Sequence, residues 1–301
     1  MKSVKQFSLF AIIFNPNSTG DAPSIAKRLR HSLQSVADKR TIRLVPTEYA
    51  GHAEMIAYDI ACSEAHPLII SVSGDGGYNE VINGVRRAKA DNKAKDPVVT
   101  VVGAGNANDH YRVVHKRSSL LKRLDKAPRS IDLIRVDVLL PDGKSLIRYA
   151  HSYVGVGITP LVAEELNRHK LHPLKELQII VKTLLTSRST KIRQDGHVRA
   201  VDSLIFANIQ QMAKVLTLND SNSLHDGKFE VVELPHTNIF GLLRTLITSA
   251  TVGLKAQPKR EEYTFTLLKK GSLQVDGELL PCEAESEITV TVAKDAVQIL
   301  L

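Results

Sequence analysis

Along the first third of the chain, short uninterrupted apolar runs alternate with segments in which apolar residues recur at helical spacing. The run 9–14 is the clearest, because all of its residues are apolar and a polar, turn-forming segment follows at once. The expected strands are 9–14, 41–45, 67–72 and 97–102, and the expected helices are 23–37, 52–64 and 78–90. Apolar strands that alternate with helices are typical of a parallel sheet covered on both faces. We therefore expect an α/β domain over residues 1–130, with 290–301 as a candidate strand to complete it.

Beyond residue 131 the pattern changes to strand-like segments separated by tight turns. Pro141-Asp142-Gly143, Gln194-Asp195-Gly196 and Val275-Asp276-Gly277 mark these turns, since Asp-Gly favours a hairpin. The expected strands are 131–140, 146–154, 197–208, 263–268 and 288–292. A helical pattern at 173–187 interrupts them, with its apolar residues on one face. The pattern predicts a second domain over residues 131–289, a mostly antiparallel β-sandwich.

Composition narrows the class of partner. Lys and Arg number 40 against 32 for Asp and Glu, which gives a formal net charge of +8 and favours an anionic partner. Aromatic residues make up only 5% of the chain and Trp is absent, so we expect no stacking platform for single strands and no nucleic-acid partner. Basic residues concentrate at 112–129 and 166–199, which form either ordinary solvated surface or a contact for anionic lipid head groups.

Cysteine usage and the length of the apolar runs bear on the compartment. Cys62 and Cys282 lie too far apart in sequence to form a zinc ribbon, a CxxC redox site or a disulfide framework. No apolar stretch reaches the roughly 18 residues of a membrane span. Both features predict a cytoplasmic protein.

Loops rich in glycine and asparagine follow the expected strands of the first domain. They are Asn15 to Gly20, Gly74 to Gly77 and Gly103 to Asn106. Because the carboxyl ends of parallel strands share one edge of the sheet, these loops should lie together where α/β proteins bind ligands. Backbone N–H groups of glycine and helix N-termini bind phosphate. The loops therefore favour a nucleotide site. Each loop alone is also explained as an ordinary turn that joins a strand to the next helix.

Asp75 adds a chemical requirement to this site. A carboxylate beside phosphates repels them unless a divalent cation or a sugar hydroxyl intervenes, so Asp75 implies Mg²⁺ or sugar recognition. The chain contains no GxxxxGK[ST], GxGxxG, HExxH or GxSxG pattern. Their absence argues against the familiar P-loop, dinucleotide, zinc-protease and nucleophile-elbow sites.

Taken together, these motifs resemble those of soluble bacterial diacylglycerol kinases, within the lipid kinase family that includes sphingosine and ceramide kinases. The segment 74–84 resembles the signature GDGTxNEVxNG, the most specific of the matches. Other segments resemble the opening loop NPxSG, a second nucleotide loop, GTxNDxAR, a DGxxxV metal loop and the late DGE motif. They are, in that order, 15–20, 47–53, 105–112, 226–231 and 276–278. The resemblance runs nearly end to end and implies an architecture shared with NAD kinases.

The resemblance also implies roles for individual residues. Asp276 would be the general base that accepts the proton of a lipid hydroxyl, with Glu278 in support; alternatively, Asp276 is a hairpin turn residue. Asp226 would hold a structural Mg²⁺, together with the backbone carbonyls of Ser223 and Lys228. The implied nucleotide contacts are Asn15, Pro16, Asn17, Ser18, Thr19, Thr47, Gly74, Asp75, Gly76, Gly77, Tyr78, Asn79, Glu80 and Asn106.

The implied activity is ATP-dependent, Mg²⁺-assisted phosphorylation of diacylglycerol to phosphatidic acid. The acceptor site would lie in the second domain, and the protein would bind anionic lipid at the inner face of the membrane. Alternatives are a kinase for another lipid alcohol, a sphingoid base or NAD, or a catalytically weak relative that binds nucleotide or anionic lipid. Gly77 and Asn106 favour the weak relative, because each stands where the family pattern has threonine. Monomer and homodimer are both left open.

Overall fold

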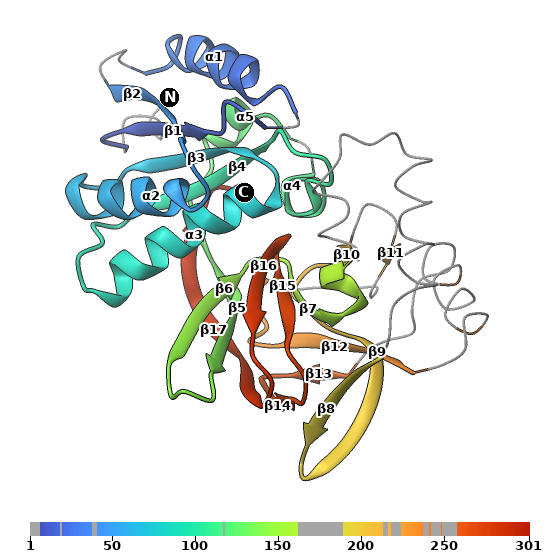
Figure 1. Ribbon diagram of the computed structural model, residues 1–301. Coiled ribbons are helices and arrows are strands. Elements are labelled where there is room, and N and C mark those ends of the chain that lie inside the picture. The colour runs from blue at the N-terminus through green and yellow to red at the C-terminus, as the bar shows by residue number, and fades with distance from the viewer. Residues whose placement is uncertain are drawn as a thin grey trace. The chain divides into compact units, whose positions relative to one another are not determined.

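The computed structural model describes residues 7–18, 20–37, 41–116, 118–161, 189–212, 216–217, 224–236, 241, 248 and 258–301. The chain forms two compact units (Figure 1). Unit 1 consists of Met1–Asp132 together with Lys294–Leu301, and unit 2 of Leu133–Ala293. Within the described parts of the chain, no helix has the length and apolar character needed to cross a bilayer.

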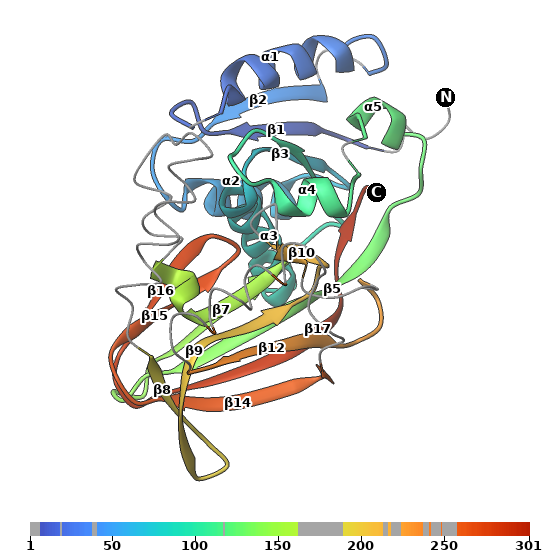
Figure 2. The same cartoon turned by 90° about the vertical axis from the view of Figure 1, so that its right-hand side faces the viewer.

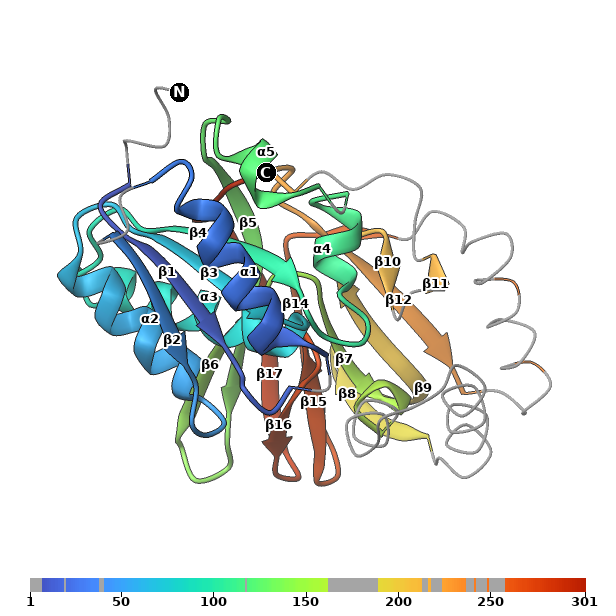
Figure 3. The ribbon, with the colours of Figure 1, turned by 90° about the horizontal axis from the view of Figure 1, so that it is seen from above.

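Unit 1 is built on a parallel sheet, as the alternating pattern predicts. The strands β1 (Phe10–Phe14), β2 (Ile42–Pro46), β3 (Leu68–Ser73) and β4 (Val98–Gly103) lie in the order β2-β1-β3-β4 (Figure 3). Every residue of β1 and β3 is buried, which explains their uninterrupted apolar runs. Gln298 and Ile299, near the C-terminus, pair in parallel with the start of β4. The C-terminal segment therefore completes the sheet of unit 1.

Helices cover both faces of this sheet (Figure 2). On one face, α1 (Ala22–Leu33) buries Ala22, Ala26 and Leu33 against the sheet and α5 (Leu120–Arg123) joins the same core. The other face carries α2 (His52–Ser63) and α3 (Asp75–Ala90), which pack on each other. A Cβ on Gly84 of α3 would overlap the carbonyl of Glu54 in α2, so glycine sets this close approach. A short helix, α4 (Asp109–Val113), follows β4.

Unit 2 is mostly antiparallel, also as expected. Its strand β9 (His197–Ala207) pairs with β7 (Tyr153–Gly157), β8 (Thr190–Gln194) and β12 (Phe229–Pro235). One side of these strands and their neighbours forms a large core, and Tyr153, Ile205, Ala207 and Val232 form a second cluster. The remaining strands of the chain, of which β5 begins and β17 ends in unit 1, are β5 (Arg129–Leu139), β6 (Ser145–Ala150), β10 (Gln211–Met212), β11 (Leu216–Thr217), β13 (Lys259–Arg260), β14 (Glu262–Leu267), β15 (Gly271–Val275), β16 (Glu278–Cys282) and β17 (Ser286–Ile299).

The structure departs from the expected elements at two places that matter for the site. The helix expected from Tyr78 begins at Asp75, so the glycine-rich segment forms its first turn. The single strand expected at 146–154 is interrupted at His151 and Ser152, because their N–H groups bind the carboxylate of Asp276. The helix expected at 173–187 lies outside the described residues.

Candidate active site

In unit 1, the loops at the carboxyl ends of the strands touch one another, as the parallel sheet predicts. The N–H of Thr47 donates to the carbonyl of Phe14 at 2.9 Å, and the N–H of Ala104 donates to the carbonyl of Ser73 at 2.9 Å. A Cβ on Gly20 would overlap the carbonyl of Ala104, and one on Gly105 would overlap the Cα of Gly74. These glycines are therefore needed for the close approach of the loops, beyond any role as turn residues.

The first loop, which follows β1, is stabilised by hydrogen bonds between its own residues. The N–H of Asn17 donates to Oδ1 of Asn15 at 2.8 Å, the N–H of Ser18 donates to the Asn15 carbonyl at 3.2 Å, and the Ser18 hydroxyl donates to the Gly20 carbonyl at 2.8 Å. Asn15, Pro16 and Asn17 are exposed. Thr19, also implied by the resemblance, lies outside the described residues.

The glycine-rich segment presents backbone donors at the start of α3. Gly74 is the extended residue before the helix, and its carbonyl accepts the hydroxyl of Ser73 at 2.9 Å. The Ser73 hydroxyl also shares a hydrogen bond of 2.6 Å with that of Ser71. The first N–H groups of a helix have no carbonyl partner within it, so the partly exposed turn at Gly76 and Gly77 suits an anion.

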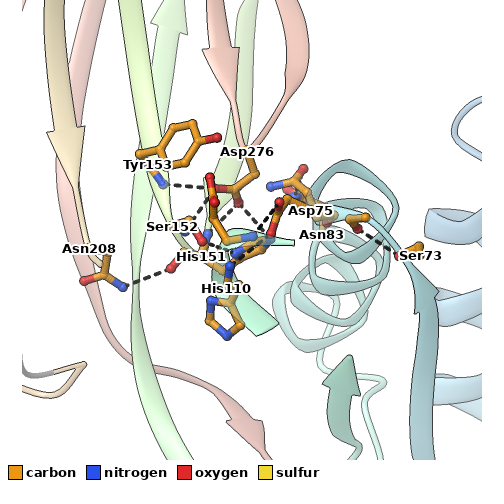
Figure 4. Close-up of polar contacts among 12 residues, drawn as sticks. Ser73, Asp75, Asn83, His110, His151, Ser152, Tyr153, Asn208 and Asp276 are labelled. Atoms are coloured by element: carbon orange, nitrogen blue, oxygen red, sulfur yellow. Dashed lines mark hydrogen bonds and ion pairs between the residues drawn. The ribbon is translucent and has the colours of Figure 1, made fainter. Parts of the chain in front are cut away.

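Two acids of the signature join neighbouring loops to α3, a role the sequence did not indicate. The carboxylate of Asp75 accepts the N–H groups of Asp109 (2.9 Å) and His110 (3.1 Å) at the start of α4 (Figure 4). The carboxylate of Glu80 accepts the N–H groups of Gly51 (3.0 Å) and Ala53 (3.1 Å) at the start of α2. Each acid thus stabilises a helix N-terminus and fixes the loop that precedes it.

The other implied nucleotide residues differ in exposure. Asn106 is exposed and Thr47 is partly exposed, so both side chains are accessible. Tyr78 and Asn79 are buried. The Tyr78 ring lies 5.3 Å from that of His110, and Asn79 accepts hydrogen bonds from the amide of Asn83. Their side chains contribute to the packing beneath the loops.

The basic run 112–129 does not lie entirely on the protein surface, although the sequence led us to expect exposed basic side chains throughout it. Arg123 is fully buried, and it donates to Thr100 Oγ1 (2.6 Å) and to the carbonyls of Leu300 (3.0 Å) and Val101 (3.1 Å). Burial lowers the pKa of Arg123 to about 10. Arg123 therefore ties the C-terminal segment to β4. Among the described basic residues of this run, those that stay exposed are Lys116, Lys122, Lys126 and Arg129, and Arg117 lies outside the described residues. Of the second run, residues 166–188 lie outside the described residues.

In unit 2, the Asp276-Gly277 turn joins β15 to β16 with positive φ at both residues, 50° and 96°. The side chain of Asp276 is buried, and it points toward His151, Ser152 and Tyr153 (Figure 4). Its Oδ2 accepts the N–H of His151 at 2.7 Å, and its Oδ1 accepts those of Ser152 (2.9 Å) and Tyr153 (3.0 Å). These donors compensate the buried charge and fix the orientation of the carboxylate.

A histidine and a serine extend this arrangement, and the sequence patterns did not reveal them. His151 Nε2 lies 3.2 Å from Asp276 Oδ2, and its Nδ1 lies 2.7 Å from the Ser152 hydroxyl. Both side chains are fully buried. Glu278, two residues beyond Asp276, is exposed. The turn therefore carries one buried, oriented carboxylate and one accessible carboxylate.

The turn at Asp226 differs from a metal loop. Asp226 Oδ1 accepts the N–H of Lys228 at 3.2 Å, while its Oδ2 lies 2.6 Å from Nζ of Lys259. Burial raises the pKa of the Glu230 carboxyl, and the hydrogen bond to Asp226 raises that of Lys259. Across the described residues, no three His, Cys, Asp or Glu side chains gather as metal ligands. The described residues of this turn therefore do not by themselves form the implied Mg²⁺ site, and Ser223, whose carbonyl the resemblance implies as a ligand, lies outside the described residues.

Comparison with known proteins agrees with the motifs. Residues 10–138 match the family of the diacylglycerol kinase catalytic domain. A diacylglycerol kinase of Staphylococcus carnosus (strain TM300) is 25% identical over 284 residues, covering 89% of this chain and 87% of its own. A diacylglycerol kinase of Bacillus subtilis (strain 168) is 25% identical over 295 residues, covering 90% and 91%.

The fold has solved counterparts. A crystal structure of a diacylglycerol kinase from Bacillus anthracis str. Sterne superposes with a TM-score of 0.67, covering 98% of this chain and 97% of that one at 17% identity. At this identity the likeness concerns the fold. The family match spans the strand-end loops of unit 1, and the curated relatives are similar along most of the chain; together they indicate a lipid kinase that resembles the bacterial diacylglycerol kinases.

Proposed function

We propose that this protein transfers the γ-phosphoryl group of ATP to the hydroxyl of diacylglycerol, giving phosphatidic acid and ADP. The observation that carries the proposal is the amide-lined turn at Gly76 and Gly77, set among loops that the signature residues hold together. Another lipid alcohol or a sphingoid base is the alternative acceptor, because the family match concerns the catalytic domain and leaves the acceptor open.

In this proposal, ATP lies against the strand-end loops of unit 1. The phosphates accept from the backbone of Gly74 to Gly77, and the exposed side chains of Asn15, Asn17 and Asn106 lie around them. Mg²⁺ arrives with ATP, held by phosphate oxygens and water, as is usual for this ion. Asp75 acts on the nucleotide through α4, since its carboxylate accepts the N–H groups of Asp109 and His110.

The Asp276-Gly277-Glu278 turn supplies the base. As the lipid oxygen bonds to the γ-phosphorus and the bond to the β-phosphate oxygen breaks, the hydroxyl proton passes to the carboxylate of Asp276. The N–H groups of His151, Ser152 and Tyr153 hold that carboxylate in place. Glu278 supports it from the exposed side of the turn.

Asp75→Ala should abolish measurable Mg·ATP binding. Two N–H groups at the start of α4 lose their acceptor, which costs about 1–3 kcal/mol each when they stay buried and lets the 104–110 loop move. Titration calorimetry measures the affinity, and thermal unfolding reports the fold. Asp59→Ala, which removes an exposed acid from α2, is the matched control and should bind normally. Undiminished affinity in Asp75→Ala would remove Asp75 from the nucleotide site.

Binding to vesicles with anionic lipid should weaken steeply as salt rises to about 0.5 M, because the Debye length falls to a few ångströms. The exposed residues Lys122 and Lys126 of the 112–129 run are the candidate contacts. Reversing both to Glu should weaken sedimentation with vesicles, whereas reversing the exposed Lys89 and Lys93 should not. Binding that depends on neither salt nor lipid charge would make this run ordinary surface.

A further inference from the structure

Strand register in unit 2 places a lysine against the turn that resembles the family's metal loop. Strand β12 pairs antiparallel with β13, so that Glu230 lies directly opposite Lys259 and Phe229 opposite Arg260. The N–H of Val231 donates to the carbonyl of Pro258 at 3.0 Å and supports this register. Directly opposed residues on antiparallel strands interact through their side chains. Asp226 precedes β12 in the adjoining turn, within reach of the same lysine.

The ammonium of Lys259 contacts both acids of this cluster. Its Nζ lies 2.6 Å from Asp226 Oδ2 and 3.4 Å from Glu230 Oε1. The Glu230 side chain is only 4% exposed, so its charge requires a counterion nearby. The Lys259 side chain is 37% exposed and can keep part of its hydration. One ammonium thus forms ion pairs with the buried carboxylate of Glu230 and the half-buried carboxylate of Asp226.

We propose that the ammonium of Lys259 is a built-in cation that replaces a divalent metal at the Asp226 turn. Mg²⁺ requires oxygen ligands at about 2.1 Å in octahedral geometry, and Oδ2 of Asp226, which would have to be one of them, is already in contact with the Lys259 nitrogen at 2.6 Å. The other oxygen, Oδ1, already accepts the N–H of Lys228. A divalent ion added beside the ammonium would place three positive charges against two carboxylates.

The consequence is a turn that is complete without metal. The fold of unit 2 should then be indifferent to chelators, and Mg²⁺ would be needed only with the nucleotide. This inference does not depend on the identity of the lipid acceptor or on turnover. It concerns the stability and metal affinity of the nucleotide-free protein. It can therefore fail while the proposed kinase activity holds, and the proposed kinase activity can fail while the inference holds.

The test compares four full-length proteins without nucleotide: wild type, Asp226→Asn, Lys259→Met and the double variant. Thermal unfolding is recorded in EDTA and in millimolar MgCl2 at matched ionic strength, and Mg²⁺ binding is titrated calorimetrically. Wild type and Asp226→Asn should respond identically to Mg²⁺. Lys259→Met should unfold at a lower temperature in EDTA and recover by at least about 3 °C with Mg²⁺, because the vacated carboxylates now hold the ion. The double variant should lose that recovery.

A Mg²⁺-dependent stabilisation of wild type that Asp226→Asn removes would overturn the proposal, because the turn would then bind metal despite Lys259. Lys259→Met that folds normally and gains no Mg²⁺ response would also overturn it. If Lys259→Met does not fold, the comparison of wild type with Asp226→Asn still decides the question. That comparison changes only one partly exposed side chain.

Discussion

Gly77→Thr alone should lower kcat/KM at least about tenfold, because the first turn of α3 has no room for a side chain at this position. A Cβ on Gly77 would lie 2.7 Å from Cβ and 2.9 Å from Oγ of Ser73. Ser73 cannot easily give way, since its hydroxyl is bonded to both Ser71 and the Gly74 carbonyl. Overpacking of this kind typically costs about 1–3 kcal/mol. Steady-state kinetics with diacylglycerol, together with thermal unfolding, measures the effect.

The same geometry predicts a compensating exchange. Ser73→Gly removes the clashing hydroxyl, so Ser73→Gly with Gly77→Thr should recover most of the lost activity, with the threonine hydroxyl now in the space that Ser73 occupied. Ser73→Gly alone should be impaired, because the Gly74 carbonyl loses its donor. The four proteins form a double-mutant cycle, and the coupling between 73 and 77 is its readout. Wild-type activity of Gly77→Thr would contradict this account.

The crowding at Gly77 also distinguishes an active kinase from the alternative, a catalytically weak relative. If Gly77 and Asn106 merely marked lost hydroxyls, Gly77→Thr with Asn106→Thr would raise the rate. The crowding at Ser73 predicts a slower enzyme instead. A faster double variant would support a weakened site.

Asp276→Asn should lower kcat at least about 100-fold, the usual scale for loss of a general base. The amide also disturbs the turn, because it offers a donor where Oδ2 now accepts the N–H of His151. Each mismatched buried group costs about 1–3 kcal/mol, so unfolding must be measured beside turnover. Mg·ATP affinity should persist, since the nucleotide residues belong to unit 1.

Glu278→Gln is the matched control for this experiment. Its side chain is exposed, so the change should leave stability intact and reduce kcat less than Asp276→Asn does. A larger loss in Glu278→Gln would exchange the roles of the two acids. Near wild-type turnover of a folded Asp276→Asn would leave Asp276 as a turn residue only.

The sequence predicted those parts of the fold that depend on the pattern of neighbouring residues. The uninterrupted apolar run of β1 and its fully buried neighbour β3 indicated a parallel sheet, and the glycine loops after them meet at its edge. The start of α3 was predicted three residues late, because Asp75-Gly76-Gly77 resembles a loop although glycine is tolerated in a first helical turn.

Contacts between distant segments could not be predicted in this way. Asp276 interrupts the strand at His151 and Ser152 from more than a hundred positions away. Lys259 meets Asp226 only through the register of β12 and β13. Arg123 resembled surface because its neighbours in sequence are basic, yet it lies beneath the C-terminal segment. Each of these depends on tertiary structure that no local pattern encodes.

The most direct test of the central claim is transfer of labelled γ-phosphate from ATP to lipids in mixed micelles. The panel contains diacylglycerol, a sphingoid base, another lipid alcohol and a micelle without acceptor. The account predicts Mg²⁺-dependent labelling of diacylglycerol as phosphatidic acid by wild type, with little label from Asp276→Asn at equal Mg·ATP binding. Labelling of a different lipid would change the proposed acceptor and leave the proposed kinase activity in place. A wild-type protein that binds Mg·ATP but labels none of the lipids would contradict the proposed kinase activity.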